Sequence, residues 1–483
     1  MKKPVAISVE PRCFSDDEVP EGWKLVTILD ACEVNPPKPP KDFLPADAPV
    51  TFVPMPAVDA DMGAITNPEI KPYLEVRNGF TSFRDGDVIM AKITPCMENG
   101  KAAIVHGMKN GIGFGSTEFH VMRSRGEILP EYLYYYIRQK SFRNEAESHF
   151  TGSVGQKRVP TDFIKQSVIP LPPLAEQQRI VARVEALLSH VDAAGDRLSR
   201  VPLIMKRFRQ AVLAAACSGR VTEEWRDSYR KIEPSTLLFS KIQTCINQKY
   251  LESCETAKRT GGRRPKDEKN NKKSNKPVID LPELPETWNY YRLEELSHLI
   301  TDGTHVTPNY IDKGIPFLSV KNIRPFSISV DNIKLISPEE HYSINQRCNP
   351  EFQDILYTKV GSFGYAVQNK LGYPFSLFVS VALIKPVKEH FTPDYAEIVM
   401  NSPIIFKQAN DRVSGSGTPD LHLIEIRDFR IPLPPLAEQR EIVRRVGLLF
   451  ERADAIKREV AAAGRRCERL TQAVMVKAFS GRF

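Results

Sequence analysis

Hydrophobic residues recur at heptad spacing in two stretches of the chain, one before its middle and one at its C-terminal end. Two apolar positions in every seven, with charged residues between them, predict long helices whose narrow seam packs against another helix. Some forty residues of helix make an arm of roughly 60 Å. The predicted coiled-coil seam consists of Ile180, Val184, Leu187, Val191, Leu198, Val201, Met205, Phe208 and Val212 in the first stretch and of Ile442, Val446, Leu449, Ile456, Val460, Leu470 and Val474 in the second.

The two stretches are copies of each other. Each begins with the same nine residues, IPLPPLAEQ, at Ile169–Gln177 and again at Ile431–Gln439. The register is kept afterwards, since the tripeptide Ser-Gly-Arg at 218–220 recurs 262 residues later at 480–482. Prolines at the start suit the first turn of a helix, whose N–H groups lack partners in any case. We therefore expect two equal arms that can pair antiparallel, with Pro202 kinking or breaking the first arm.

Each arm follows a segment in which strand and helix signals come in the same order. FRDGDVIMAKI at 83–93 has a turn signal and a β-rich run, and EFQDILYTKV at 351–360 echoes it. Mainly helical stretches follow at Pro130–Glu147 and Pro393–Asn410. The expected fold class is α+β. Two mixed, β-rich globular domains with helices are separated by two long antiparallel helices that form a coiled-coil spacer, and the whole has a pseudo-two-fold internal repeat.

The repeat also sets the expected boundaries. A length of 483 residues is too great for one core and suits two domains of ordinary size plus connecting helices. We expect an N-terminal tail at 1–19, a globular domain called head 1 at 20–168, arm 1 at 169–219, a linker at 220–284, a second globular domain called head 2 at 285–430, and arm 2 at 431–483.

Net charge is concentrated in one short segment of the predicted linker. The chain carries +8, but Lys258–Lys276 alone has nine Lys or Arg residues and two acidic ones, so only one positive charge in excess remains elsewhere. The segment is poor in apolar residues and rich in Gly, Asn and Lys, which predicts a disordered tether at 258–276. Loose contact with phosphates is the alternative role.

Cysteine usage and hydropathy bear on the compartment. The eight cysteines are scattered, without a CxxC pair or an accompanying histidine pair, and are typical of reduced structural thiols. No apolar run approaches the roughly 20 residues of a membrane span, and the N-terminal residues lack the apolar core of a signal peptide. We expect a cytoplasmic protein, bacterial or archaeal in the light of the resemblance described below, with no membrane association.

Candidate catalytic motifs are weak. The sequence Asn35-Pro36-Pro37-Lys38 is similar to the motif with which amino-methyltransferases hold a flipped base, but Lys38 replaces the aromatic ring that stacks on it. GIGFGS at 111–116 lacks the spacing of a dinucleotide site and is interpreted as a turn. His305 has no cysteine or second histidine nearby for a metal site or a triad. We therefore expect no catalytic residue, no metal and no cofactor in this chain.

The repeated motifs resemble those of the specificity subunit of type I restriction-modification systems. The arm motifs carry most of the resemblance, and the motifs of the heads are weaker. The second arm ends at SGRF without the TEEWR that follows the first. The matching features are PLPPLAEQ in both copies, KRFRQAVLAAACSGRVTEEWR at 206–226, PEGW at 20–23, TDGTHVTPNY at 301–310, GIPFLSVKNI at 314–323, GDVIMAK at 86–92 and DILYTK at 354–359.

The resemblance implies a non-catalytic DNA-recognition subunit. Each head is then a target-recognition domain that reads one half of a bipartite double-stranded DNA site. The arms set the spacer and dock the partner subunits. The family further implies two methyltransferase subunits, which bring S-adenosylmethionine, and restriction or translocase subunits, which bring ATP and Mg²⁺.

Candidate DNA contacts are polar, flexible or basic residues at matched places in the two heads. Arg or Lys can read guanine, Gln or Asn can read adenine, and Ser, Thr and Gly backbone N–H groups can hold phosphates. The alternative for each is a capped turn or a solvated loop. The candidates are Lys92, Thr94, Lys101, Ser116, Thr117, Gly152, Ser153, Gln156, Lys157 and Arg158 in head 1, and Thr301, Asp302, Gly303, Thr304, His305, Lys321, Asn322, Lys359, Ser362, Ser416 and Thr418 in head 2.

Two other classes of protein stay open at this stage. A pseudo-symmetric scaffold that binds only proteins agrees with the near-neutral charge outside the basic segment. It predicts weak and unspecific DNA binding. A fused restriction enzyme needs catalytic motifs that the sequence does not offer.

Overall fold

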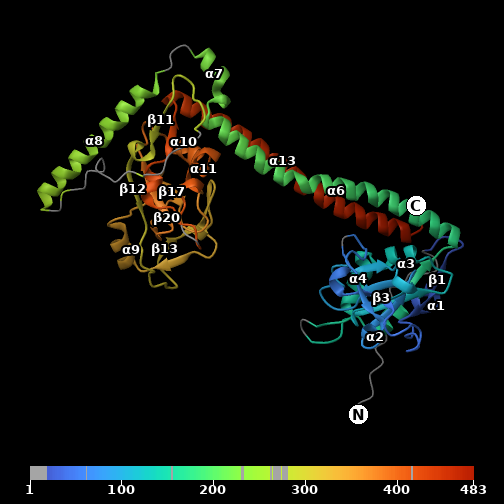
Figure 1. The fold of residues 1–483 in the computed structure, drawn as a ribbon. Coiled ribbons are helices and arrows are strands. Elements are labelled where there is room, and N and C mark those ends of the chain that lie inside the picture. The colour runs from blue at the N-terminus through green and yellow to red at the C-terminus, as the bar shows by residue number, and fades with distance from the viewer. Residues whose placement is uncertain are drawn as a thin grey trace. The chain divides into compact units, whose positions relative to one another are not determined.

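The computed structural model describes residues 19–60, 62–153, 156–229, 233–261, 264, 274, 281–414 and 417–483. The chain forms two compact units, each with one head and parts of both arms (Figure 1). The first unit combines the residues up to Ser199 with Val460–Phe483, and the second consists of Arg200–Glu459. Residues 1–18, most of the predicted tail, lie outside the described residues.

Both arms are single long helices. Helix α6 spans Leu174–Cys217 and helix α13 spans Leu436–Phe479, each 44 residues long. Both begin directly after the prolines of the repeated motif, as the sequence predicts. Helix α6 continues through the exposed Pro202, so the expectation of a break there is wrong. A proline ring removes one hydrogen bond, and on an exposed helix face water satisfies the carbonyl that is left over.

Head 1 contains two four-stranded sheets and a short ribbon. The orders are β4-β3-β8-β5 and β2-β9-β6-β7, with β3 and β8 parallel, and β1 pairs antiparallel with β10. The strands are β1 (Lys24–Thr27), β2 (Cys32–Val34), β3 (Pro49–Val53), β4 (Glu69–Pro72), β5 (Thr81–Arg84), β6 (Val88–Ala91), β7 (Ala102–Ile104), β8 (Ile112–Gly115), β9 (Phe119–Ser124) and β10 (Val168–Leu171), and the helices are α1 (Ile28–Ala31), α2 (Tyr73–Val76), α3 (Pro130–Ile137), α4 (Lys140–Ser148) and α5 (Thr161–Gln166), with 3-10 turns η2 (Met55–Ala57) and η3 (Lys109–Gly111).

Head 2 repeats this plan. Its four-stranded sheet has the order β12-β20-β17-β18, and a parallel pair, β13 and β19, recurs in a second sheet with β16. The strands are β11 (Asn289–Arg292), β12 (Ser297–Asp302), β13 (Ile315–Leu318), β14 (Ile323–Arg324), β15 (Ser327–Ile328), β16 (Lys334–Ile336), β17 (Ile355–Thr358), β18 (Ala366–Gln368), β19 (Ser376–Leu377), β20 (Val381–Pro386) and β21 (Arg430–Leu433), and the helices are α9 (Pro338–Asn345), α10 (Pro393–Met400), α11 (Pro403–Arg412) and α12 (Leu423–Arg427), with 3-10 turns η6 (Leu293–Leu296) and η7 (Val320–Asn322).

The repeated motif joins each head to its arm. In head 1 its first residues form β10, which pairs with β1, and the hydroxyl of Tyr132 donates to the carbonyl of Pro170 at 2.8 Å. Gln177 is buried at the first turn of α6, where it accepts from the Leu129 N–H and donates to the Pro172 carbonyl. Gln439 makes the same kinds of contact in head 2. The motif is repeated letter for letter because the same joint is built twice.

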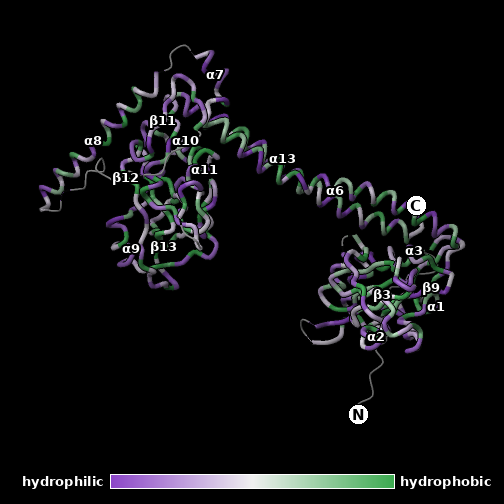
Figure 2. The backbone as a smooth tube through the Cα atoms, in the orientation of Figure 1, coloured by the Kyte–Doolittle hydropathy of each residue, from purple (hydrophilic) through white to green (hydrophobic). Residues whose placement is uncertain are grey.

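The end of each arm completes the core of the head that belongs to the other repeat. Met475, Ala478 and Phe479, at the end of α13, are buried in the core of head 1. At the matching repeat positions of α6, Leu213, Ala216 and Cys217 are buried in the core of head 2. Figure 2 shows hydrophobic segments within each head and mixed segments along both long helices. The sequence does not reveal this exchange, because both ends look only like amphipathic helix.

Within each unit the two long helices run antiparallel. In the first unit Arg179 donates to the carbonyl of Phe483, and in the second Arg209 donates to the Asp454 carboxylate at 2.6 Å. The early part of one helix thus lies beside the late part of the other. Together with the two similar heads, this confirms the predicted fold class.

Most of the predicted seam is buried or half-buried, with two exceptions. Ile456 and Leu470 are 45% and 53% exposed, so their assignment to the seam is wrong. A straight helix of 3.6 residues per turn drifts by about 20° per heptad against a seam of period 3.5. Along the 44 residues of α13, about six heptads, this drift carries some heptad positions out to solvent, and Ala453 is buried near one of them instead.

Two further segments differ from the sequence expectations. The central residues of GIGFGS, Ile112–Gly115, form β8 and not a turn: a Cβ at Gly113 would lie 2.3 Å from the ring of Phe83, so glycine is needed inside the sheet. The predicted linker contains helices α7 (Glu223–Ser228) and α8 (Ser235–Thr260), together with η4 (Arg220–Thr222). The predicted disordered segment therefore begins within α8, and its residues after Gly261, except 264 and 274, lie outside the described residues.

Candidate nucleic-acid interface

Three loop segments meet at one edge of head 1. The Lys92 N–H donates to the carbonyl of Glu118, and the Val159 N–H donates to the carbonyl of Lys92. The Thr94 N–H in turn donates to the carbonyl of Lys157 at 3.0 Å. These backbone bonds gather candidates that are far apart in the sequence: Lys92, Thr94, Ser116, Thr117, Gln156, Lys157 and Arg158.

An ion pair fixes one side of this loop cluster. The Arg158 guanidinium donates two hydrogen bonds of 2.9 Å to the Glu118 carboxylate and a third to the Gln156 carbonyl. The bonds from Arg158 lower the pKa of Glu118 and raise the pKa of Arg158 itself. Arg158 is therefore held as part of the loop, while the neighbouring Gln156 and Lys157 remain exposed. The sequence did not single out Glu118, since a lone acidic residue carries no pattern.

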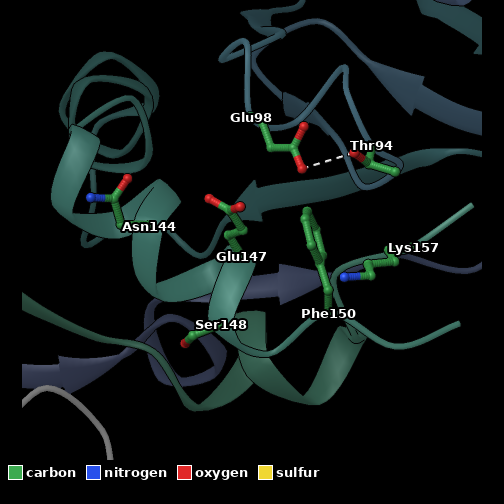
Figure 3. Close-up of a pocket in the computed structure, with 7 residues that line it drawn as sticks. All are labelled: Thr94, Glu98, Asn144, Glu147, Ser148, Phe150 and Lys157. Atoms are coloured by element: carbon green, nitrogen blue, oxygen red, sulfur yellow. Dashed lines mark hydrogen bonds between the residues drawn. The ribbon is translucent and has the colours of Figure 1, made fainter. Parts of the chain in front are cut away.

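A hollow of about 480 Å³ opens beside these loops. In Figure 3 Glu98, Glu147, Phe150 and Lys157 extend toward a common space, and the Thr94 hydroxyl donates to Glu98 at 2.8 Å. Carboxylates in DNA-binding loops accept from the amino groups of cytosine or adenine and repel phosphates. The hollow is therefore suited to base edges. Neither acid stands out in the sequence, because Glu147 belongs to an ordinary polar face of α4 and Glu98 lies in a turn without a motif.

The remaining candidates of head 1 take different positions. Gly152 and Ser153 are exposed next to residues 154 and 155, which are not described. The Lys101 ammonium donates to the carbonyl of Met55 at 3.1 Å and so supports η2.

In head 2 several candidates form a buried charged network and not an exposed surface. Asp302 is 3% and Lys359 4% exposed, and their charged atoms lie 3.6 Å apart. Asp302 also accepts from Arg347 at 2.9 Å and lies 3.3 Å from His305. Thr301 and Gly303 are buried beside them. This network positions the surrounding loops, so exposed contacts at this place are limited to neighbours such as Thr304, His305 and Arg347.

Arg347 was not among the residues predicted from sequence. It donates to the carbonyls of Asp302 and Gly303 as well as to the Asp302 carboxylate, yet its side chain is 54% exposed. It lies 45 residues from Asp302, and no local motif connects the two.

The other candidates of head 2 divide between structural and exposed positions. Asn322 is buried, accepting from the Ser319 N–H and donating to the Ser329 carbonyl, so it caps η7. Lys321, Ser362 and Thr418 are exposed. Ser416 lies outside the described residues.

The methyltransferase-like motif has a structural role. Asn35 has a left-handed backbone conformation, with φ of 51°. Its side-chain amide nitrogen lies 3.2 Å from Nδ1 of His120. Its side-chain oxygen accepts from the Val121 N–H. Burial lowers the pKa of His120. Asn35 therefore ties the end of β2 to β9 and does not point toward a substrate space.

Across the described ranges, no group of three His, Cys, Asp or Glu side chains is arranged to hold a metal ion.

Comparison with known proteins adds to this picture. A family model described as the type I restriction modification DNA specificity domain matches residues 20–201 and 285–461. The specificity subunit of the Escherichia coli type I restriction enzyme EcoAI is 28% identical over 486 residues, covering 93% of this chain and 81% of that protein.

Two solved structures share the fold. The HsdS subunit from Thermoanaerobacter tengcongensis is 21% identical, with a TM-score of 0.56, covering 96% of this chain and 98% of that one. A chain from a structure concerned with complex assembly and conformational transition of the type I R-M system is also 21% identical. Its TM-score is 0.63, and 96% of this chain and 99% of that one are covered.

Proposed function

The chain belongs to the family of type I restriction-modification DNA specificity proteins, and we propose that each of its heads reads one half of a bipartite double-stranded DNA target. The observation that carries the proposal is that the two family matches coincide with two heads whose four-stranded sheets β2-β9-β6-β7 and β12-β20-β17-β18 have matching strand orders. Each head presents a different set of exposed loop residues at matched places, Gln156 and Lys157 in one and Thr418 in the other. Different loops on one scaffold support different half-sites.

The arms act as the spacer in this proposal. The antiparallel contacts of α6 with α13 inside each unit and the burial of each arm's end in a head support this role. A rigid connection keeps a constant number of unread base pairs between the half-sites, and half-sites about one helical turn apart present the same face of the duplex.

The family places the chain in an assembly with DNA and other restriction-modification subunits. We propose two methyltransferase subunits that bring S-adenosylmethionine, together with restriction or translocase subunits that bring ATP and Mg²⁺. This chain itself acts as the recognition subunit and not as a catalytic one. A cytoplasmic location is part of the proposal. None of the helices in the described ranges is sufficiently long and apolar to span a bilayer.

Mapping of modified adenines tests the proposal. When the chain is co-expressed with its methyltransferase subunit, we expect single-molecule sequencing of the host genome to show a split motif with a fixed gap. A stable complex without new methylation, and with DNA binding that ignores sequence, would instead support the protein-only scaffold.

The spacer function has a test of its own. Insertion of four residues near Asp196, in the exposed part of α6, is expected to change the gap between the half-sites and to leave both half-sites unaltered. The readout is again the methylation motif. Altered half-sites with an unchanged gap contradict the spacer role. The control is a substitution at the same site, Asp196→Ala, which keeps the helix length.

A further inference from the structure

A second hollow, of about 800 Å³, lies within the second unit where the arms meet head 2. Helix α6 contributes Lys206 and Arg209, and the η7–β14 corner of head 2 contributes Lys321 and Arg324. None of the described residues that line it is acidic. We call it the basic hollow. The candidate contacts chosen from the sequence touch it only through Lys321 and Ser362, since no residue of an arm was among them.

Three of its four cations have no carboxylate partner among the described residues. Arg209 is neutralised by Asp454 and lies over the ring of Phe450, 4.7 Å from the ring centre. Lys206, Lys321 and Arg324 are exposed and enter no ion pair in the described ranges. Three unpaired positive charges around one concave surface attract a polyanion, and the attraction is stronger than for the same charges spread on a convex face.

Phe326, one of the residues that line the basic hollow, has an unfavourable backbone conformation. Phe326 has φ of 62°, in the left-handed region that residues with a Cβ rarely adopt. It is held there by the Ala366 carbonyl, which accepts from its N–H, and by edge-to-face contact with Phe450 at 5.5 Å. This conformation closes the turn between β14 and β15, so it fixes Arg324 at the rim. Strain of this kind clusters at functional sites.

The internal repeat shows that the two arm cations, Lys206 and Arg209, are not a requirement of the fold. The positions of α13 that match Lys206 and Arg209, 262 residues later, are Glu468 and Thr471. Gln210 and its match Gln472 are kept, and Gln472 accepts from the Lys140 N–H in the first unit. The late part of the arm thus packs on a head without these two cations in one copy and with them in the other. The two arm cations of the basic hollow therefore belong to one side of the repeat only.

We propose that the basic hollow binds the phosphodiester backbone of DNA next to the half-site that head 2 reads. Arg and Lys at such a place contribute affinity and orientation but no sequence information. The arm therefore contributes to DNA binding on this side in addition to acting as a spacer. This inference rests on the DNA-recognition function proposed above.

The test compares DNA binding of the full chain, in complex with its methyltransferase subunits, with and without two of the cations. For the double variant Lys206→Gln/Arg324→Gln we expect at least roughly tenfold weaker binding of a random-sequence duplex, because charge-assisted contacts are each worth about a factor of ten. The slope of log K against log salt should become shallower by about 1.8, since each phosphate contact contributes about 0.9. The methylation motif should stay unchanged.

The control removes the same charge elsewhere on the arms. Lys457→Gln/Arg458→Gln changes two exposed cations of α13 that do not line the basic hollow. An equal loss of affinity in this control, or an unchanged salt slope in the double variant, overturns the proposal while the recognition function stands. Lost binding of the methyltransferase subunits, with DNA affinity intact in whatever complex remains, points to an acidic protein surface as the occupant and also overturns it. A wild-type complex that does not bind DNA refutes both proposals.

Discussion

Replacing Phe479 by alanine is expected to lower the free energy of unfolding of the first unit by about 3–5 kcal/mol, the usual cost of removing a buried phenyl ring. Phe479 is 2% exposed, and its ring packs against two tyrosines of α3. Its ring centre lies 4.8 Å from that of Tyr132 and 5.3 Å from that of Tyr136. Because α13 supplies this ring to the core of head 1, the loss should appear as faster amide exchange in α3. The measurement is denaturant unfolding together with hydrogen-exchange mass spectrometry.

The matched control lies one helical turn earlier. Val476 is 57% exposed on the same helix, so Val476→Ala should change neither the unfolding free energy nor the protection of α3 appreciably. Wild-type protection of α3 in the Phe479→Ala variant contradicts the packing of α13 into head 1.

Replacing Glu438 by alanine is expected to cost about 3 kcal/mol in the second unit, because removal of one partner leaves buried groups unpaired. The Glu438 side chain is fully buried and accepts from the Trp288 indole at 2.8 Å and from the Thr222 hydroxyl at 2.7 Å. The guanidinium of Arg226, from α7, donates a hydrogen bond of 2.5 Å to the same carboxylate. Three segments are tied to this one carboxylate. Amide exchange should therefore increase in residues 220–229, and the fluorescence of Trp288 should change.

The repeat supplies the control at the equivalent position. Glu176 occupies the same place at the start of α6, but its only ion pair among the described residues is with Arg179 on the same helix, and both side chains are partly exposed. Pairs of this kind contribute little to stability. Glu176→Ala should therefore have a much smaller effect. Similar losses in the two variants mean that the buried contacts of Glu438 do not hold α7.

The resemblance drawn from the repeated arm motifs is confirmed by the family match and by the relatives' names. The strand signals at 83–93 and 351–360 are borne out by β5, β6 and β17. These successes share a cause: periodicity, turn residues and helix starts are local features, each set by neighbours within a few positions in the chain. The predicted DNA contacts are different in kind, because exposure depends on what folds over a residue. Asp302 and Lys359 show this, since a buried ion pair and an exposed loop charge look alike in sequence.

The duplication, the two arms of equal length and register, and the family all follow from the amino-acid sequence alone. Periodicity and repetition can be read one position after another, which is why no tertiary information was needed for them. Which groups meet depends on the tertiary fold: Thr222 meets Glu438 across 216 positions and Lys140 meets Gln472 across 332, and the cations of the basic hollow come from α6 and the η7–β14 corner. Such contacts depend on the path of the whole chain, because packing of the arm ends into the heads brings together residues with no relation in sequence.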